Sequence, residues 1–300
     1  MNIGTIRDGA APRPAIVEGD RAYRLDDLLG AMGGVPVTVP DGADAATVLA
    51  TRELLVAARA AADALPDLIA RGAAPSYPLY ALGPPVPRPG KIVCAGRNYA
   101  DHARELGEDV PSLPILFAKL ATSICGPFDD VVRPLEVDDL DYEAELCVVI
   151  GAGGRRIPRD RALAHVGGYC CANDVSARTA QLGLGDQWLR GKSFDTFCPI
   201  GPWIVTGDEI PDPQALTARC RVDGTLRQNG STADMIFDVA TLVSYISDAF
   251  TLEPGDLILT GTPAGVAMGQ SPPPWLQPGQ LCEVEIPEIG VIANRIVGET

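Results

Sequence analysis

The sequence has no apolar run long enough to cross a membrane and no apolar signal-peptide core near its start. Basic residues are scarce: 24 Lys and Arg stand against 39 Asp and Glu, which gives a net charge of -15 at pH 7. Such a charge would be repelled by a nucleic-acid backbone or an anionic lipid surface. We therefore expect a cytoplasmic protein that binds neither nucleic acid nor a membrane.

Paired cysteines and phosphate-binding loops are missing as well. The eight cysteines are scattered, mostly in apolar segments, and none forms a C-x-x-C pair, so we expect them to be reduced and structural rather than ligands of zinc or a redox centre. The glycine-rich turns match neither a Walker loop nor a dinucleotide-binding loop, which gives nucleotides little weight as ligands. Only two histidines occur in the chain.

Proline marks a boundary between two parts of the chain. Six prolines lie between Ala73 and Gly90, and neither a helix nor a central strand tolerates such a density. We predict a small N-terminal α/β domain, residues 1–85, followed by a larger domain, residues 86–300. The first should contain a hairpin over Ala15–Tyr23 and a helix from Thr47 to about Ile69.

The larger part alternates short Val- and Ile-rich runs with Gly, Pro and Asp. The predicted strands are 91–95, 146–150, 201–206, 216–222, 256–260 and 281–286. Helices are expected near Tyr99–Leu106, Ala177–Leu182 and Met235–Phe250. Because regular strand-helix alternation is absent, we expect a mostly β fold with some α structure (α+β) and curled, mixed sheets.

Carboxylates gather in two of the motifs. Glu143 and Glu145 are two residues apart in a predicted strand, so both side chains project from one face. Buried together, they would repel each other unless a divalent metal or basic side chains neutralise them. Asp174 is a candidate for a third carboxylate, and three such oxygens suit Mg2+, Mn2+ or Ca2+. Taken alone, the glutamates could instead form the wet face of a strand, and Asp174 could be an N-cap.

Three further patterns point to proton transfer and substrate binding. His102 and Glu105 are three apart, so on a helix they share a face and can activate a water. Lys192 follows a glycine that would allow a ligand to approach its ammonium group. The turn with Gly261 and Thr262 offers a hydroxyl and backbone N–H groups to a carboxylate. The alternatives are a surface His/Glu pair, a solvated lysine and a turn without a ligand.

Five motifs stand in an order that resembles the fumarylacetoacetate hydrolase family, over residues 91 to 297. They are Ile92 to His102 (IVCAGRNYADH), Asp141 to Leu146 (DYEAEL), Asn173 to Arg178 (NDVSAR), Gly191 to Asp195 (GKSFD) and Thr260 to Val266 (TGTPAGV). The resemblance implies a β-rich roll of curled sheets, a homodimer, and a divalent metal, commonly magnesium, held by three carboxylates. Leu120 departs from the family, many members of which have proline after the lysine that matches Lys119.

The resemblance also implies roles for individual residues. The metal ligands would be Glu143, Glu145 and Asp174, and the proton-transferring residues would be His102 and Glu105, with Lys192 facing substrate oxygens. The substrate-binding residues would be Gln181, Thr262, Gly261 and Arg97, with Lys119 as a further candidate.

The reaction implied first is metal-dependent hydrolysis of a carbon-carbon bond in a 2,4-dioxo acid such as an acylpyruvate. Glu105, oriented by His102, would take a proton from water, and the acyl fragment would leave from a metal-stabilised enolate. A decarboxylase, an isomerase or tautomerase, or a dehydratase of a related 2-oxo acid passes through the same enolate, and the fold does not choose between them. The remaining alternative is a catalytically idle dimer that binds an oxo acid.

Overall fold

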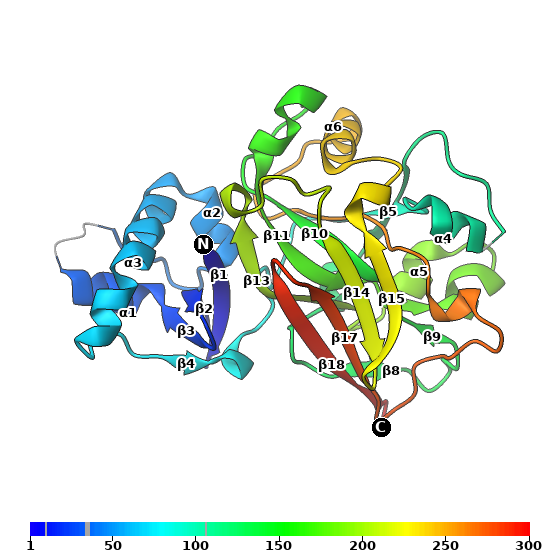
Figure 1. The fold of residues 1–300 in the computed structure, drawn as a ribbon, viewed down its shortest axis with the longest axis horizontal. Coiled ribbons are helices and arrows are strands. Elements are labelled where there is room, and N and C mark those ends of the chain that lie inside the picture. The colour runs from blue at the N-terminus through cyan, green and yellow to red at the C-terminus, as the bar shows by residue number, and fades with distance from the viewer. Residues whose placement is uncertain (10, 34–36, 106) are drawn as a thin grey trace.

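The computed structural model describes residues 1–9, 11–33, 37–105 and 107–300. Strands dominate it, and they form a long mixed sheet against which a smaller sheet packs (Figure 1). Both parallel and antiparallel pairs occur in the long sheet. The prediction of a mostly β, α+β fold with mixed sheets is therefore confirmed.

The long sheet has eleven strands among the described residues, in the order β4-β3-β2-β1-β13-β11-β10-β16-β5-β6, with β7 paired to β13. Their bounds are β1 (Asn2–Asp8), β2 (Ala11–Glu18), β3 (Arg21–Arg24), β4 (Tyr77–Pro78), β5 (Ile92–Gly96), β6 (Ile115–Lys119), β7 (Ile124–Cys125), β10 (Ala144–Ile150), β11 (Val166–Asn173), β13 (Cys198–Thr206) and β16 (Leu257–Leu259).

The smaller sheet has the order β15-β14-β17-β18-β8, and β9 and β12 form a separate pair. These strands are β8 (Val131–Arg133), β9 (Leu140–Asp141), β12 (Ser176–Ala177), β14 (Thr217–Val222), β15 (Thr225–Ser231), β17 (Leu281–Ile286) and β18 (Gly290–Gly298). Buried residues alternate along β14 and β17, as expected when only one face of a sheet is covered.

Six α-helices of the described residues pack around the sheets (Figure 1). They are α1 (Leu25–Met32), α2 (Ala45–Ala50), α3 (Arg52–Ala70), α4 (Ala100–Glu105), α5 (Trp188–Lys192) and α6 (Val239–Ala249). The first three bury apolar side chains against the long sheet, and the last packs into the core that the two sheets share. A π-helical turn spans Thr179–Gly183, and short 3₁₀ segments span Leu79–Ala81, Ala121–Ser123, Arg159–His165, Gly207–Glu209, Thr232–Asp234 and Ala267–Gly269.

Strand β10 is buried along its full length because both of its faces are covered. Its side chains alternate between the faces: Leu146 and Val148 belong to the core between the two sheets, and Cys147 and Val149 to the core beneath α1 and α3. A strand covered on both sides reads as a nearly continuous apolar run. Glu145 is the polar exception in this run, and it is the second residue of β10, at the rim of the core.

The N-terminal part joins the long sheet directly. Strand β1 pairs antiparallel with β13, with Ile3 opposite Ile204. The predicted hairpin is confirmed, since β2 and β3 pair across a turn in which Gly19 has φ 58°. These pairings continue across the predicted boundary at residue 85, and the division into 1–85 and 86–300 stays a prediction.

Three predicted helices differ in detail. The single helix predicted from Thr47 to Ile69 is two helices, because Thr51 is extended (φ -112°, ψ 110°) between α2 and α3. Helix α6 begins after Asp238, which accepts the N–H of Thr241 at 2.7 Å and caps it. Helix α4 is described to Glu105; Leu106, where the predicted helix ends, lies outside the described residues.

Candidate active site

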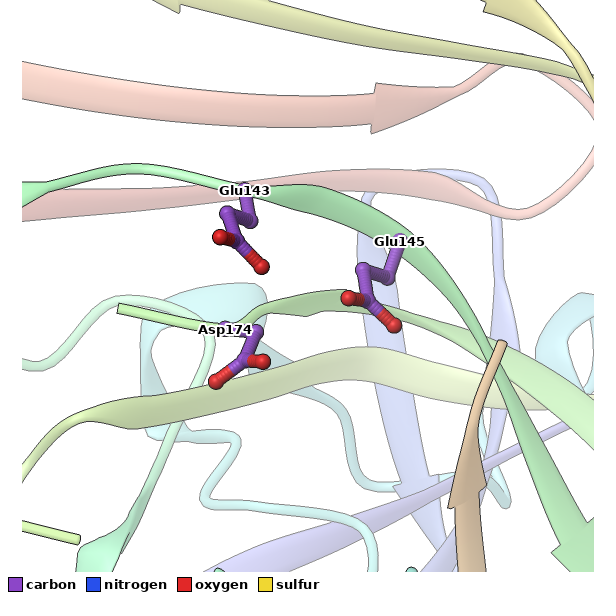
Figure 2. Close-up of side chains that lie close together, drawn as sticks. All are labelled: Glu143, Glu145 and Asp174. Carbon is purple, nitrogen blue, oxygen red and sulfur yellow. The ribbon is translucent and has the colours of Figure 1, made fainter. Parts of the chain in front are cut away.

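Glu143, Glu145 and Asp174 lie together where β10 begins and β11 ends. The two strands pair antiparallel with Ala144 opposite Asn173, so the residues next to this pair also lie side by side. The N–H of Asp174 donates to the carbonyl oxygen of Glu143 at 2.9 Å. One oxygen from each of the three carboxylates lies within 4.8 Å of the others, and Figure 2 shows the side chains turned toward a common space.

Buried basic side chains surround this carboxylate triad, Glu143, Glu145 and Asp174. The ammonium of Lys192 donates to Glu143 Oε2 and to Asp174 Oδ2, both at 2.8 Å. Lys119 Nζ donates to Asp174 Oδ1 at 2.6 Å, and Arg178 Nη2 donates to Glu143 Oε1 at 2.6 Å. Two members of the triad therefore have direct counter-charges.

The pKa values of the two glutamates move in opposite directions. Burial alone would raise the pKa of Glu143, but the charges of Lys192 and Arg178 and the hydrogen bond from Lys192 together outweigh it and lower the pKa to about 2. Burial raises the pKa of Glu145 well above its usual range, and the charges of Asp174 and Glu143 raise it further. Within the described parts of the chain, no basic side chain lies within ion-pair distance of Glu145, which accepts the N–H of Gly261 at 2.7 Å.

This arrangement fits a divalent cation. Glu143, Glu145 and Asp174 would hold it, and the added positive charge would balance the one carboxylate that lacks a basic partner. Magnesium, manganese and calcium prefer oxygen ligands, whereas zinc would favour sulfur or imidazole nitrogen. The donor set therefore supports a divalent metal site and does not distinguish among the three oxygen-seeking ions.

The predicted proton-transfer pair lies on α4, on one face of the helix. His102 Nδ1 lies 3.6 Å from Glu105 Oε2, and the imidazole is buried. Both oxygens of Glu105 accept the backbone N–H of Gly265, at 3.1 and 3.0 Å. The carboxylate is thereby fixed between α4 and the turn that follows β16.

One cavity of about 350 Å³ joins these groups. The predicted residues that line it are Arg97, His102, Glu105, Glu143, Glu145, Gln181, Lys192 and Thr262. Asp174 and Gly261 support the lining residues, because Asp174 accepts from Lys192 and Gly261 donates to Glu145. The substrate roles assigned from the sequence, including that of the Gly261 N–H, stay predictions.

Sequence reasoning gave no role to Arg178, although it lies within a quoted motif. It is buried and donates to Asp141 Oδ2 at 2.9 Å and to Gln181 Oε1 at 3.0 Å, besides Glu143. The need for a cation beside paired carboxylates was the available indication. Trp188, also missed, reaches the cavity from α5, and nothing in its local sequence indicates this.

The cysteines are all buried and free. Burial raises the pKa of Cys94 well above its usual range, so this thiol near the cavity is not a ready nucleophile. The burial of the cysteines fits a structural role, and the prediction that they are reduced stays a prediction.

Comparisons with known proteins agree with this geometry. Residues 91–297 match the family model described as "Fumarylacetoacetate (FAA) hydrolase C-terminal". A mitochondrial oxaloacetate tautomerase of Bos taurus is 50% identical over 214 residues, which cover 71% of this chain and 68% of the relative.

Several solved structures match the whole chain. A putative HpcE protein from Mycobacterium smegmatis has a TM-score of 0.80 at 35% identity, with full coverage of both chains. A maleylpyruvate hydrolase from Sphingobium sp. SYK-6, in complex with manganese(II) ion and pyruvate, has a TM-score of 0.78 at 29% identity, again with full coverage of both.

Proposed function

Because the chain belongs to the fumarylacetoacetate hydrolase family, we propose that it is a divalent-metal-dependent enzyme that moves a proton on a 2-oxo acid. Its reaction is the interconversion of the keto and enol forms of an acid such as oxaloacetate. The observation that carries this proposal is that the carboxylate triad, Lys192 and the His102–Glu105 pair all adjoin one cavity.

The triad end of the cavity takes the head of the substrate, its carboxylate and its 2-oxo group. A divalent cation held there would supply a Lewis acid for the 2-oxo oxygen. Lys192 lines the cavity and keeps a buried ammonium beside the triad, so it stabilises negative charge that develops on the substrate oxygens. Gln181, held by Arg178 at 3.0 Å, offers its amide N–H groups to the same region.

Glu105 is the base of the proposed reaction. Its carboxylate removes a proton from carbon 3 of the keto form, and the enol O–H forms when a proton is returned to the 2-oxo oxygen. Tautomerisation moves one proton and consumes no other reagent. His102, 3.6 Å from the carboxylate, and the N–H of Gly265 hold Glu105 in position.

Support for tautomerisation, one of the alternatives from the sequence, comes from the relative that is 50% identical and is named an oxaloacetate tautomerase. Hydrolysis of a 2,4-dioxo acid stays as the second candidate. Its support is the similar whole-chain structure of a maleylpyruvate hydrolase. In that reaction Glu105 would take the proton from a water molecule instead of from carbon, and the cavity would have to admit that water.

The test is to incubate the protein, freed of metal with EDTA and then supplied with Mg2+, with a panel of 2-oxo and 2,4-dioxo acids. Metal-dependent acceleration of the enol-to-keto conversion of oxaloacetate, followed by ultraviolet absorbance, supports the proposal. NMR that shows pyruvate and a carboxylic acid formed from an acylpyruvate would establish hydrolysis instead. Carbon dioxide release would indicate a decarboxylase. If no acid changed in a metal-dependent way, the remaining alternative would be a protein that binds an oxo acid without catalysis.

Two broader proposals accompany the reaction. We propose a homodimer, in which exposed apolar side chains of the smaller sheet such as Leu226 and Val291 are covered. Light scattering after gel filtration measures the oligomeric state.

We also propose the cytoplasm as location, because all eight cysteines are free, although some similar proteins are mitochondrial by name. Among the described helices, none is long and apolar enough to cross a membrane.

A further inference from the structure

The same cavity is lined by an arginine that the proposed reaction does not use. Arg97 Nη2 donates to Glu108 Oε1 at 2.9 Å, and its guanidinium carbon lies 5.7 Å from the ring centroid of Trp188. All three residues line the same cavity as the triad. An aromatic face beneath the guanidinium restricts its motion and leaves its edge N–H groups for an acceptor.

A series of ring contacts connects this arginine to the triad. The ammonium of Lys192 lies 5.3 Å from the ring centroid of Phe117. Phe117 in turn meets Trp188 edge to face, with 5.2 Å between ring centroids. A ligand whose head lies at the triad and Lys192 would therefore extend along the two rings toward Arg97, since Lys192, the rings and Arg97 all line one cavity.

We propose that Arg97 binds a second carboxylate at the far end of the substrate, so that the cavity selects dicarboxylic 2-oxo acids over monocarboxylic ones. This inference rests on the proposed function, because it takes the triad as the site of the substrate's head.

Glu108 acts as the internal counter-ion of Arg97 when no such substrate is bound. Its side chain is 45% exposed, against 27% for Arg97. The glutamate can therefore rotate toward the solvent and break its hydrogen bond with the guanidinium. A carboxylate bound to arginine through two parallel hydrogen bonds would replace it. Exposed ion pairs contribute little to stability, and the exchange is therefore not opposed by a strong contact.

The experiment measures binding rather than turnover. Isothermal titration calorimetry of the full chain with saturating Mg2+ compares oxalate, which mimics only the head, with 2-oxoglutarate and 2-oxopentanoate, which match in chain length and differ in the distal carboxylate. We expect 2-oxoglutarate to bind the parent protein about tenfold more tightly than 2-oxopentanoate.

Three variants separate recognition from structure. R97M should abolish the preference for 2-oxoglutarate and keep the affinity for oxalate, and R97K should restore part of the preference. E108Q should strengthen 2-oxoglutarate binding about two- to fivefold, because it removes the competitor. R104Q is the matched control: Arg104 is an exposed arginine on α4 that pairs with Asp101, and its loss should change none of the affinities.

R97M should weaken the binding of 2-oxoglutarate and E108Q should strengthen it, although both substitutions break the same ion pair. These opposite changes in affinity are the decisive result. Equal weakening of all ligands in both variants would assign the pair a structural role and overturn the proposal. A parent protein without preference, or one that binds oxalate but neither longer acid, would overturn it and leave the metal-dependent head site standing. Failure to bind oxalate with Mg2+ would overturn the proposed function together with this inference.

Discussion

At the scale of single residues, Glu143, which precedes β10, and Glu145, within β10, show how differently two glutamates at one strand end can ionise. Burial raises the pKa of Glu143, but the charges of Lys192 and Arg178 contribute to a net lowering to about 2. Glu145 lacks such a partner, and burial together with Asp174 raises its pKa. The two groups therefore contribute to stability over opposite ranges of pH.

We expect this difference in the unfolding of metal-free protein. Glu143 stabilises the fold above its ordinary pKa of 4.5, and this contribution is lost as the pH falls toward 2; it is on the order of 3 kcal/mol. For Glu145 the sign is reversed. Its contribution is complete below the ordinary pKa of 4.5 and is lost as the pH rises toward its higher folded value.

Urea unfolding in EDTA, at a series of pH values, measures both effects. E143Q should flatten the acid side of the stability curve, and E145Q should flatten the side above the ordinary glutamate pKa of 4.5. The same pH dependence in the parent and in both variants would show that these assignments are wrong.

The role of Glu105 gives a second prediction at this scale. In E105Q the amide oxygen still accepts the N–H of Gly265, as the carboxylate does at about 3.0 Å, but it cannot take a proton. We expect kcat to fall by about 10²- to 10⁴-fold, while calorimetry with Mg2+ and oxalate shows unchanged affinity. A variant with parental kcat would remove Glu105 from the reaction.

Sequence reasoning predicted the site as far as local spacing and motif order allow. The two-residue spacing of Glu143 and Glu145 predicted a shared face, and the structure brings Asp174 to them. Which cation serves which carboxylate was not predictable, because Lys119 and Arg178 come from distant strands and turns. Those contacts depend on long-range pairing, since Lys119 lies on β6, which pairs with β5, and Arg178 follows β12, which pairs with β9.

At the scale of elements, α4 is held against the 3₁₀ segment Ala267–Gly269. A Cβ added to Gly269 would lie 2.3 Å from Glu105 Cδ, nearer than side chains approach each other. The flexible end of Glu105 would move rather than the backbone. We expect G269A to lower kcat by about 100-fold, since misplacement by an ångström is enough, with Mg2+ and oxalate binding retained.

Gly30 provides the control for this substitution. It lies inside α1, and a Cβ there would meet nothing within 4 Å. G30A should leave kcat unchanged and raise the free energy of unfolding by up to about 1 kcal/mol, because alanine favours the helix. Equal kcat for G269A and G30A would contradict the contact between Glu105 and the 3₁₀ segment.

Elements with strong patterns were predicted, and their ends were not. The apolar run 146–150 predicted a strand, and the structure has β10 there, buried along its full length. The break at Thr51 between α2 and α3 leaves the helical spacing of apolar residues almost intact, so the periodicity did not show it. Likewise, the start of α6 depends on the cap at Asp238 rather than on hydrophobic spacing.

At the scale of the whole molecule, one core joins the two parts of the chain. Ile3 and Leu65 belong to the same buried cluster as Ile200 and Leu257. Figure 1 shows α1 and α3 beside β1, β2 and β3, and β1 pairs with β13. The proline-rich segment predicted a boundary from composition. Pairing between β1 and β13, some 200 residues apart in sequence, is a long-range contact that composition does not report.

The last prediction concerns residues 86–300 expressed alone. Removal of 1–85 would expose the edge of β13 and the apolar side chains beneath α1 and α3, which favours aggregation. We expect this fragment to be insoluble or loosely packed, and residues 1–85 supplied as a second chain to restore Mg2+ and oxalate binding. The full chain should then unfold in one transition by both circular dichroism and tryptophan fluorescence. A soluble fragment that binds Mg2+ and oxalate by itself would instead establish 86–300 as an independent domain, with the metal site complete within it.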